Sequence, residues 1–414
     1  MVANVNPHTL KTIGQRELVV MVALLMSLNA LAIDGMLPAL DEMAAQLGAG
    51  EGNRRQLVVA VYLLANGFGC LVPGSLADRF GRKVVLLGSI FFYGLLSLVV
   101  SVVQDFNTLL VIRGLQGLLA SGLMVLPSAI IRDQYEGDRM ARLMSLVSAV
   151  FITVPVIAPS LGQAVLLFAG WRWIFILLGG VAALAALWVW LRLPETLHAE
   201  YRQKIELSSI AVNMRDALFN RSAIGYVFGT ALLIGAVFGY VNSAQQLLGE
   251  HFKVGEWFPV VFGGTAAMMA VSSVVNSRIV ERFGARRVSH TGVIVFMIVS
   301  AVQVWAAHTH GDVLELFLPL MATNLMLLGF LGANFGSIAL QPFASIAGAA
   351  SSIHAFIRMF GAAVVGLIIG QAYDGTAQPF AHALLICSTL AFLFVLYSEK
   401  GKLFRRLNKP QRAV

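Results

Sequence analysis

Two charged residues inside apolar segments are the first candidates for chemistry in this sequence. Asp34 lies in an apolar run that begins near Leu18, and Arg113 lies in a later run that begins near Asn107. At a helical rise of ~1.5 Å per residue, Asp34 lies ~24 Å and Arg113 ~9 Å from the start of its own run. The two runs cross a hydrocarbon core ~30 Å thick in opposite directions, so the two depths are similar. We therefore expect Asp34 and Arg113 to form a pair or to share a network, to which Gln116 adds an amide one turn further on.

A carboxylate and a guanidinium in such a setting could carry a proton across a membrane. Burial favours the neutral form of a carboxylate, whereas a nearby arginine favours the charged form. A carrier needs both influences, because it loads a proton on one side and releases it on the other. We predict that Asp34, Arg113 and Gln116 couple transport to protons; a static structural pair is the alternative.

A second cluster of charges occupies a short loop between two apolar runs, within Gly74–Lys83. A glycine at position 81 permits a turn with positive φ directly after a helix end. Asp78 can then accept a hydrogen bond from a neighbouring helix N-terminus or pair with an arginine. We predict a gating loop, with topology signals alone as the alternative; its residues are Gly74, Asp78, Arg79, Gly81, Arg82 and Lys83.

A weaker copy of this loop occurs 203 positions later. Glu281 stands there in place of Asp78, Arg282 corresponds to Arg79, and a glycine again follows the phenylalanine. The spacing is close to half of the 414 residues. A repeat of this length in one membrane orientation predicts two parallel halves.

The composition requires lipid as the solvent for this chain. Apolar residues make up 58% and charged residues 12% of the sequence, which is far from a soluble protein. The apolar runs are about twenty residues long and do not alternate, which indicates helices rather than strands. We predict an all-α membrane protein with twelve spans, at residues 18–40, 56–77, 84–104, 107–131, 140–168, 172–193, 222–247, 257–279, 288–307, 313–338, 344–373 and 379–398.

The basic residues are distributed unevenly over this predicted topology. Of the 29 Lys and Arg, 23 fall on one side, four (Arg54, Arg55, Arg172, Lys253) on the other and two within spans. This asymmetry predicts that both termini lie in the cytoplasm. The net charge of +8 therefore reflects topology and not nucleic-acid binding. The basic tail after Glu399 is expected to contact anionic lipid headgroups.

The chain divides into an N-terminal half (1–193), a linker (194–221) and a C-terminal half with the basic tail (222–414). Apolar residues recur at helical spacing in the linker, which predicts an amphipathic helix on the cytoplasmic surface. No phosphate-binding loop, nucleophile elbow or metalloprotease motif occurs in the sequence. We therefore expect no enzyme activity, no cofactor and no metal, and active transport must use an ion gradient. The predicted state is a monomer.

Further polar and bend-forming residues lie within the spans. Pro155 and Pro159 remove backbone hydrogen bonds and bend the fifth span, and Gly162 allows a neighbour to pack closely. His354 and Arg358 share one face of the eleventh span. They could meet an anionic or zwitterionic substrate; snorkelling or pairing with a helix C-terminus are equal alternatives. The substrate-binding candidates are Asn242, Gln245, Gln246, His354 and Arg358.

Several of these motifs carry a resemblance to a known family. The loop at Gly74–Lys83 resembles the signature loop of the major facilitator superfamily, and its second copy is typical of that family. Arg113, Gln116 and Gly117 resemble the span-4 motif of its drug:proton antiporters, and the prolines with Gly162 resemble their span-5 antiporter motif. Segments similar to the bicyclomycin and chloramphenicol resistance branch are Ile33–Pro38, Ile131–Asp133, Trp171–Phe175 and Leu193–Leu197.

The resemblance implies the major facilitator fold and a multi-pass protein of the bacterial inner (plasma) membrane. It further implies multidrug efflux in exchange for protons by alternating access, and hence antibiotic resistance. One alternative is proton-coupled transport of a single metabolite or metal, either an anion at His354 and Arg358 or copper. Another is a membrane receptor that transports nothing.

Overall fold

The structure, a computed structural model, describes residues 13–50, 52–135, 137–197, 215, 219–343 and 347–404. Within these ranges, the side chains at 137–142, 145, 148–152, 273, 277, 281 and 347–352 are not described. The described ranges contain helices and turns but no strand. Most of the predicted linker helix, the tail beyond residue 404 and the side chain of Glu281 lie outside the described residues.

The described part of the N-terminal half contains nine α-helices. They are α1 (Gln15–Asp34), α2 (Leu40–Leu47), α3 (Leu57–Gly69), α4 (Pro73–Phe80), α5 (Arg82–Val102), α6 (Phe106–Ala120), α7 (Gly122–Gln134), α8 (Gly137–Leu166) and α9 (Arg172–Arg192). Short 3-10 turns at Leu37–Ala39 and Gly52–Gln56 precede α2 and α3.

The C-terminal half repeats this arrangement with longer, less interrupted helices. They are α11 (Arg221–Ala244), α12 (Phe258–Phe283), α13 (Ala285–His310), α14 (Leu314–Leu340), α15 (Ala347–Gln371) and α16 (Gln378–Ser398). A π-helical segment, Gln245–His251, continues α11, and a 3-10 turn at Gly255–Trp257 leads into α12.

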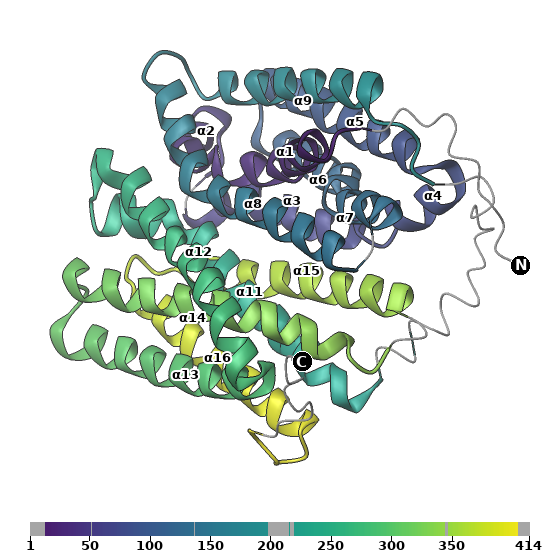
Figure 1. Cartoon of the computed structure of the whole chain (residues 1–414). Coiled ribbons are helices and arrows are strands. Elements are labelled where there is room, and N and C mark those ends of the chain that lie inside the picture. Colours follow the sequence, from purple (N-terminus) through teal and green to yellow (C-terminus); the bar gives the residue numbers. More distant parts are fainter. Residues whose placement is uncertain are drawn as a thin grey trace, which may run out of the picture.

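The two halves lie one above the other in Figure 1, with their helices running between the same two faces. Each predicted span is occupied by one helix or by consecutive helices, such as α1 with α2 and α6 with α7. Among the residues that the structure describes, ten segments are long and apolar enough to cross a membrane, and α3 with α4, bent by 46°, makes an eleventh. The long helix α8 occupies the remaining predicted span. The predicted all-α membrane fold is confirmed.

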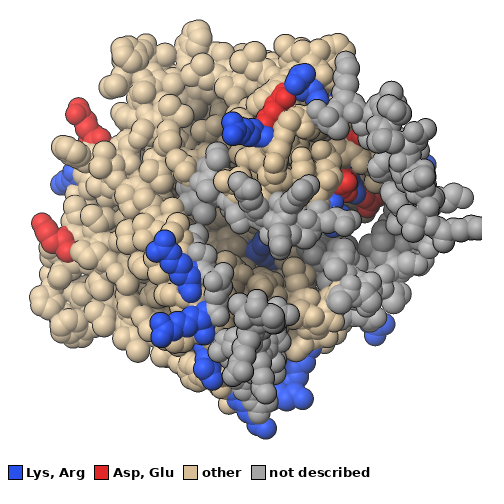
Figure 2. All heavy atoms as spheres, viewed as in Figure 1, with Lys and Arg blue, Asp and Glu red and all other residues tan. Residues whose placement is uncertain are grey.

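The outer surfaces of the halves are apolar, as lipid requires. Phe168, Leu184 and Val84 are among many large apolar side chains that are exposed. Figure 2 shows one side of the molecule, on which Lys and Arg gather around the grey residues and most of the remaining surface is uncharged. Apolar exteriors of this kind are stable only against hydrocarbon.

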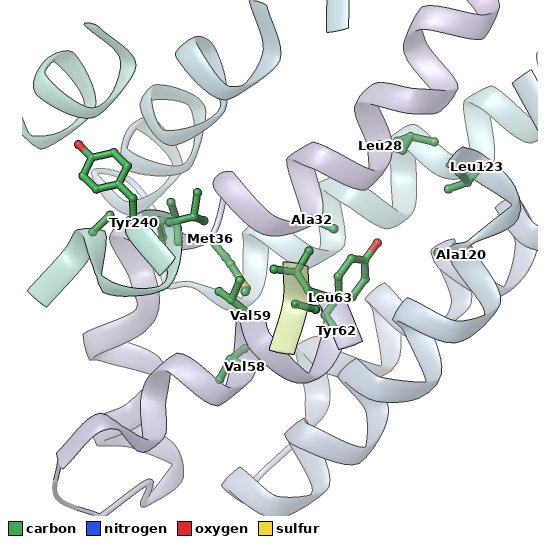
Figure 3. Close-up of a cluster of buried hydrophobic side chains, with 14 of the residues drawn as sticks. Leu28, Ala32, Met36, Val58, Val59, Tyr62, Leu63, Ala120, Leu123 and Tyr240 are labelled. Carbon is green, nitrogen blue, oxygen red and sulfur yellow. The ribbon is translucent and has the colours of Figure 1, made fainter. Parts of the chain in front are cut away.

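The interior of the N-terminal half is closely packed around α1. Figure 3 shows Leu28 and Ala32 of α1 and Met36, just after it, in one buried cluster with side chains of α3, namely Val58, Val59, Tyr62 and Leu63. This packing holds α1 and α3 together and thereby fixes the level of the polar groups that these helices carry.

Glycine turns between helices define one face of the molecule. Gly81 separates α4 from α5 with φ 104°, and Gly284 separates α12 from α13 with φ 84°. Both glycines occupy the left-handed region, which confirms that the two copies of the loop adopt one backbone shape. We call this side the Gly81 face and the opposite side, where α2 meets α3, the Asn53 face.

Candidate functional site

Arg113 on α6 is the most completely satisfied buried charge in the N-terminal half. Its side chain is fully buried; Nη2 donates to the Ala32 carbonyl at 3.0 Å and Nε to the Val58 carbonyl at 3.2 Å. Nη1 donates to Gln116 Oε1 at 2.7 Å. The guanidinium also lies over the Tyr62 ring, 4.3 Å from its centroid. Arg113 therefore ties α6 to α1 and α3.

Gln116 extends this network to α5. Its Nε2 donates to Ser97 Oγ at 2.7 Å and to the Tyr93 carbonyl at 3.3 Å. The Tyr93 hydroxyl donates to the Leu28 carbonyl of α1 at 2.7 Å. Arg113 and Gln116 thus belong to one buried network that reaches α1 by two routes.

Asp34 lies at the end of α1 and does not pair with Arg113. It is 5% exposed, and within the described part of the chain no hydrogen bond or ion pair reaches its carboxylate. The donors of Arg113 are used by Ala32, Val58 and Gln116 instead. The sequence predicted that Arg113 and Asp34 lie at a similar depth, and Arg113 does bond to α1 two residues before Asp34. It bonds to a backbone carbonyl, however, and the direct pair with Asp34 is absent in this structure.

The residues predicted to bend the fifth span lie on α8, which packs against this end of α1. Pro155 and Pro159 lie inside α8. A Cβ at Gly162 would lie 1.9 Å from the Gly35 carbonyl oxygen, so only glycine allows the two backbones to approach this closely. The position next to Asp34 is therefore a backbone contact between α1 and α8.

The predicted gating loop forms a cluster of charges on the Gly81 face. Arg82 is buried and pairs with Asp78 at 2.7 Å and with Asp133 of α7 at 2.9 Å. Asp133 also accepts from the Thr196 hydroxyl at 3.2 Å. Asp78 itself is half-exposed, because it lies at the outer edge of the cluster. The other loop residues lie on the same elements: Gly74 is the second residue of α4, Arg79 lies over the Phe80 ring, and Lys83 Nζ donates to the Trp190 carbonyl at 2.8 Å.

Glu195, just after α9, caps the helix that this loop starts. Its carboxylate accepts from the backbone N–H groups of Arg82 at 2.8 Å and Lys83 at 3.2 Å. A carboxylate there satisfies free N–H groups at the start of α5 and complements the helix dipole. A Cβ at Gly81 would lie 2.3 Å from Glu195 Oε2, so the glycine also leaves room for this cap. The sequence marked this segment only by resemblance and did not predict the contact.

The C-terminal half has a counterpart at Glu399, just after α16. Its carboxylate accepts from Arg286 Nε at 2.8 Å and from the Tyr226 hydroxyl at 2.7 Å. Burial acts to raise the pKa of Glu399, but the hydrogen bonds from Tyr226 and Arg286 outweigh it, and the pKa lies below its ordinary value. Arg282 of the second loop copy lies over the Phe283 ring, with 5.4 Å to its centroid.

His290 of α13 fixes the end of the described chain. Its Nδ1 accepts from the Phe404 backbone N–H at 2.8 Å, so Nε2 carries the proton in the neutral ring. Nε2 lies 3.0 Å from the Tyr226 hydroxyl, which donates onward to Glu399. This buried chain of hydrogen bonds connects Phe404 to α11 and to Glu399.

Polar side chains of both halves interlock at the Asn53 face. Asn53 Nδ2 donates to the carbonyls of Gln371 at 3.0 Å and Tyr373 at 2.7 Å, and its Oδ1 accepts from Gln246 at 2.8 Å. Arg55 contacts Asp41 of its own half and Glu250 of the other half. We call these residues, together with Gln56 and Gln245, the Asn53 layer. Gln245 donates to Asp41 at 3.0 Å, and Gln246 accepts from Gln56.

The predicted substrate-binding residues therefore lie at different levels. Gln245 and Gln246 belong to the Asn53 layer. Asn242, one turn before them on α11, is 2% exposed, and neither polar atom of its amide has a hydrogen-bond partner. His354 packs against the Phe343 ring, 5.5 Å between centroids, and Arg358 lies one turn further along α15. The structure does not gather the five residues into one site.

Two parallel six-helix halves with charges buried inside them define a secondary transporter. The chain belongs to the Major Facilitator Superfamily, whose family model matches residues 22–398. The chain is thus a multi-pass transporter of the bacterial inner (plasma) membrane and not an enzyme.

Three relatives from bacteria are similar along almost their whole length. The chain is 28% identical to an uncharacterized MFS-type transporter, YdgK, of Bacillus subtilis, over 94% of this chain and 96% of the relative. It is 26% identical to a bicyclomycin resistance protein homolog of Haemophilus influenzae, with coverages of 90% and 94%. It is also 26% identical to the multidrug resistance protein MdtL of Vibrio parahaemolyticus, with coverages of 89% and 92%.

Solved structures share the fold at lower identity. A D-xylose-proton symporter superposes with a TM-score of 0.70 at 14% identity, over 93% of this chain and 98% of the symporter. The human organic anion transporter MFSD10 (TETRAN) gives a TM-score of 0.64 at 17% identity, over 94% of this chain and all of that one.

Proposed function

We propose that the protein exports small amphipathic compounds in exchange for protons. The resistance proteins among its relatives support efflux as the direction and drugs as the substrate class. The asymmetry of Lys and Arg supports a cytoplasmic Gly81 face, so the Asn53 face is external in this proposal. The Asn53 layer then closes the external side, and substrate enters from the cytoplasm.

The observation that carries proton coupling is Asp34, a buried carboxylate without a partner. A charged carboxylate without partners is costly in an apolar interior, and a proton removes that cost. Asp34 lies beside the contact between Gly35 and Gly162, so a shift of α8 against α1 changes its surroundings. Arg113 bonds to α1 two residues earlier and can favour the charged form after a small displacement. Proton release and helix movement are coupled in this way.

Purified protein in proteoliposomes with an imposed pH gradient tests this role. Asp34→Asn should abolish uphill export of a transported drug and retain downhill exchange, because the site no longer cycles a proton. The Asn107→Ala variant, altered on the Asn53 face away from Asp34, is the matched control and should export normally. Uphill, proton-coupled export by Asp34→Asn would show that another acid carries the proton.

The gating loop has a separate role in this proposal. Asp78 is half-exposed and lies at the Gly81 face, away from the helix centres, so it cannot contact a substrate held midway through the membrane. Asp78→Asn weakens the pair with Arg82 and should slow transport without loss of substrate binding. Equilibrium binding and transport should be measured on one preparation of the Asp78→Asn variant. A parallel loss of substrate binding and transport in a folded protein contradicts the gating role.

A further inference from the structure

The two arginines within the spans, Arg113 and Arg358, differ in their partners. Every nitrogen of the Arg113 guanidinium donates to an oxygen of the protein, and two aromatic rings face it. Arg358 has no hydrogen bond, ion pair or ring contact of this kind in the part of the chain that the structure describes. Its Nε is buried without a partner. The donors of Arg113 are thus all used by the protein, whereas those of Arg358 find no acceptor among the residues that the structure describes.

Arg358 lies too deep to place its charge in water at a membrane surface. It is near the middle of α15 (Ala347–Gln371), about 17 Å along the axis from one end and about 20 Å from the other. The hydrocarbon core is ~30 Å thick, so the side chain cannot reach either edge by snorkelling. A charge held at this depth without a partner is costly and indicates a function.

The surroundings of Arg358 lie between the two halves. A Cβ at Gly67 of α3 would lie 2.7 Å from the backbone nitrogen of Phe360, so α3 and α15 touch directly beside this position. Phe356 of α15 meets Phe68 of α3 edge-on at 6.3 Å. Cys70, which directly follows α3, is the titratable side chain that interacts electrostatically with Arg358 among the described residues. A thiol cannot balance the charge of a guanidinium.

Aromatic rings lie at the neighbouring contact between α3 and α15. Phe356 and Phe360 stack with their centroids 5.4 Å apart, and Phe68 adds a third ring from the other half. A guanidinium with free donors binds a carboxylate by two parallel hydrogen bonds, and aromatic walls bind an apolar body. Alternating access exposes a substrate between the two halves, and the uncompensated charge of Arg358 lies there.

We propose that Arg358 binds the anionic group of an amphipathic organic anion, with the apolar body of that compound held between the two halves. This proposal rests on the proposed transport function, since it names a substrate class for that transporter. Substrates of this class carry a carboxylate or a similar planar anion on an aromatic or aliphatic body.

Three probes with one apolar body and different head groups test the proposal: naphthoate, naphthamide and naphthylmethylammonium. Binding to the purified protein in detergent at pH 7.5 is measured by isothermal titration. The wild type should bind naphthoate at least about 10-fold more tightly than naphthamide, as a charge-assisted pair requires. Arg358→Gln should remove this preference, and Arg358→Lys should retain part of it because the charge remains.

Two further variants keep the test independent of folding. Arg221→Gln removes an exposed arginine of the same half and should leave the preference for naphthoate unchanged. Cys70→Asp places a carboxylate beside Arg358, so it should stabilise the protein against heat and weaken naphthoate binding by competition. Cys70→Asn, of the same size but uncharged, should do neither.

The outcomes separate this proposal from the transport function. Absence of naphthoate binding to the wild type, equal binding of the three probes, or an unchanged preference in Arg358→Gln each overturns the anion site. None of these results bears on proton coupling, because binding in detergent needs no gradient. Conversely, a loss of proton-driven export with intact naphthoate preference overturns the antiporter and leaves the anion site standing.

Discussion

Asn53→Ala should open the Asn53 face of the transporter. The Asn53 side chain makes three hydrogen bonds to the C-terminal half, to the carbonyls of Gln371 and Tyr373 and to the Gln246 amide. All three exist only while this face is closed, so their loss destabilises the closed state alone. At a net value of about 0.5–1 kcal/mol for each bond near the surface, the change is about 2 kcal/mol. The ratio of open to closed molecules should rise about 30-fold.

Distance measurements between spin labels provide the assay. Cysteines replace Gln104, which is exposed, and Thr376, which is partly exposed. The two residues lie on the Asn53 face in different halves, and Cys70 and Cys387 are alanine in this background. Electron–electron resonance then gives the distribution of distances between the halves in nanodiscs. Asn53→Ala should increase the population at long distance relative to the wild type.

Asn107→Ala is the matched control for this prediction. Asn107 accepts from Arg54 at 3.1 Å on the same face, but both residues belong to the N-terminal half. Its removal costs a hydrogen bond of similar exposure and none between the halves. If Asn53→Ala gives the same distance distribution as Asn107→Ala and the wild type, the Asn53 layer does not hold the halves together.

Two further variants test contacts inside single halves. Gly162→Ala places a Cβ 1.9 Å from the Gly35 carbonyl oxygen, so we expect a loss of about 1–3 kcal/mol in stability and a loss of transport. Thermal unfolding and drug export measure these effects. Gly180 has open space around it, so Gly180→Ala should be harmless, and equal melting temperatures for the two variants would contradict the close contact. Glu399→Gln tests pH dependence: because the folded-state pKa of Glu399 lies below its ordinary value of 4.5, the carboxylate stabilises the protein fully above that value and progressively less as the pH falls through the lower, folded pKa. The difference in melting temperature between wild type and Glu399→Gln should therefore be present at pH 7 and shrink below about pH 4.5, and a difference independent of pH would refute this linkage.

The fold followed from the sequence because lipid imposes a simple rule on it. Hydropathy alone located the twelve spans, since each must bury its backbone polar groups in a helix about as long as the hydrocarbon is thick. The repeated glycine turn predicted parallel halves, and Gly81 and Gly284 adopt nearly the same φ and ψ. These features depend on local composition and spacing, which a single sequence contains.

The contacts of the site depend on the directions in which side chains point, and the spacing of residues along the sequence does not specify these directions. Counting residues brought Arg113 to the level of Asp34, yet the rotation of α6 aims the guanidinium at the Ala32 carbonyl. Gln245 and Gln246 were expected to bind substrate because they are amides near a span end. Instead the π-helical turn directs them across to the other half, where they join the Asn53 layer.

The hydrogen bond between Phe404 and His290 sets a limit on how far the chain can be shortened. A chain that ends at Phe404 keeps the backbone N–H that the buried imidazole accepts, and a fusion partner joined there leaves the bond in place. A chain that ends at Lys402 leaves the Nδ1 atom of a fully buried histidine without a donor and frees the ring to take either tautomer. Tyr226 would then lose its fixed donor, and the effect of removing two residues would reach the Glu399 carboxylate on another helix.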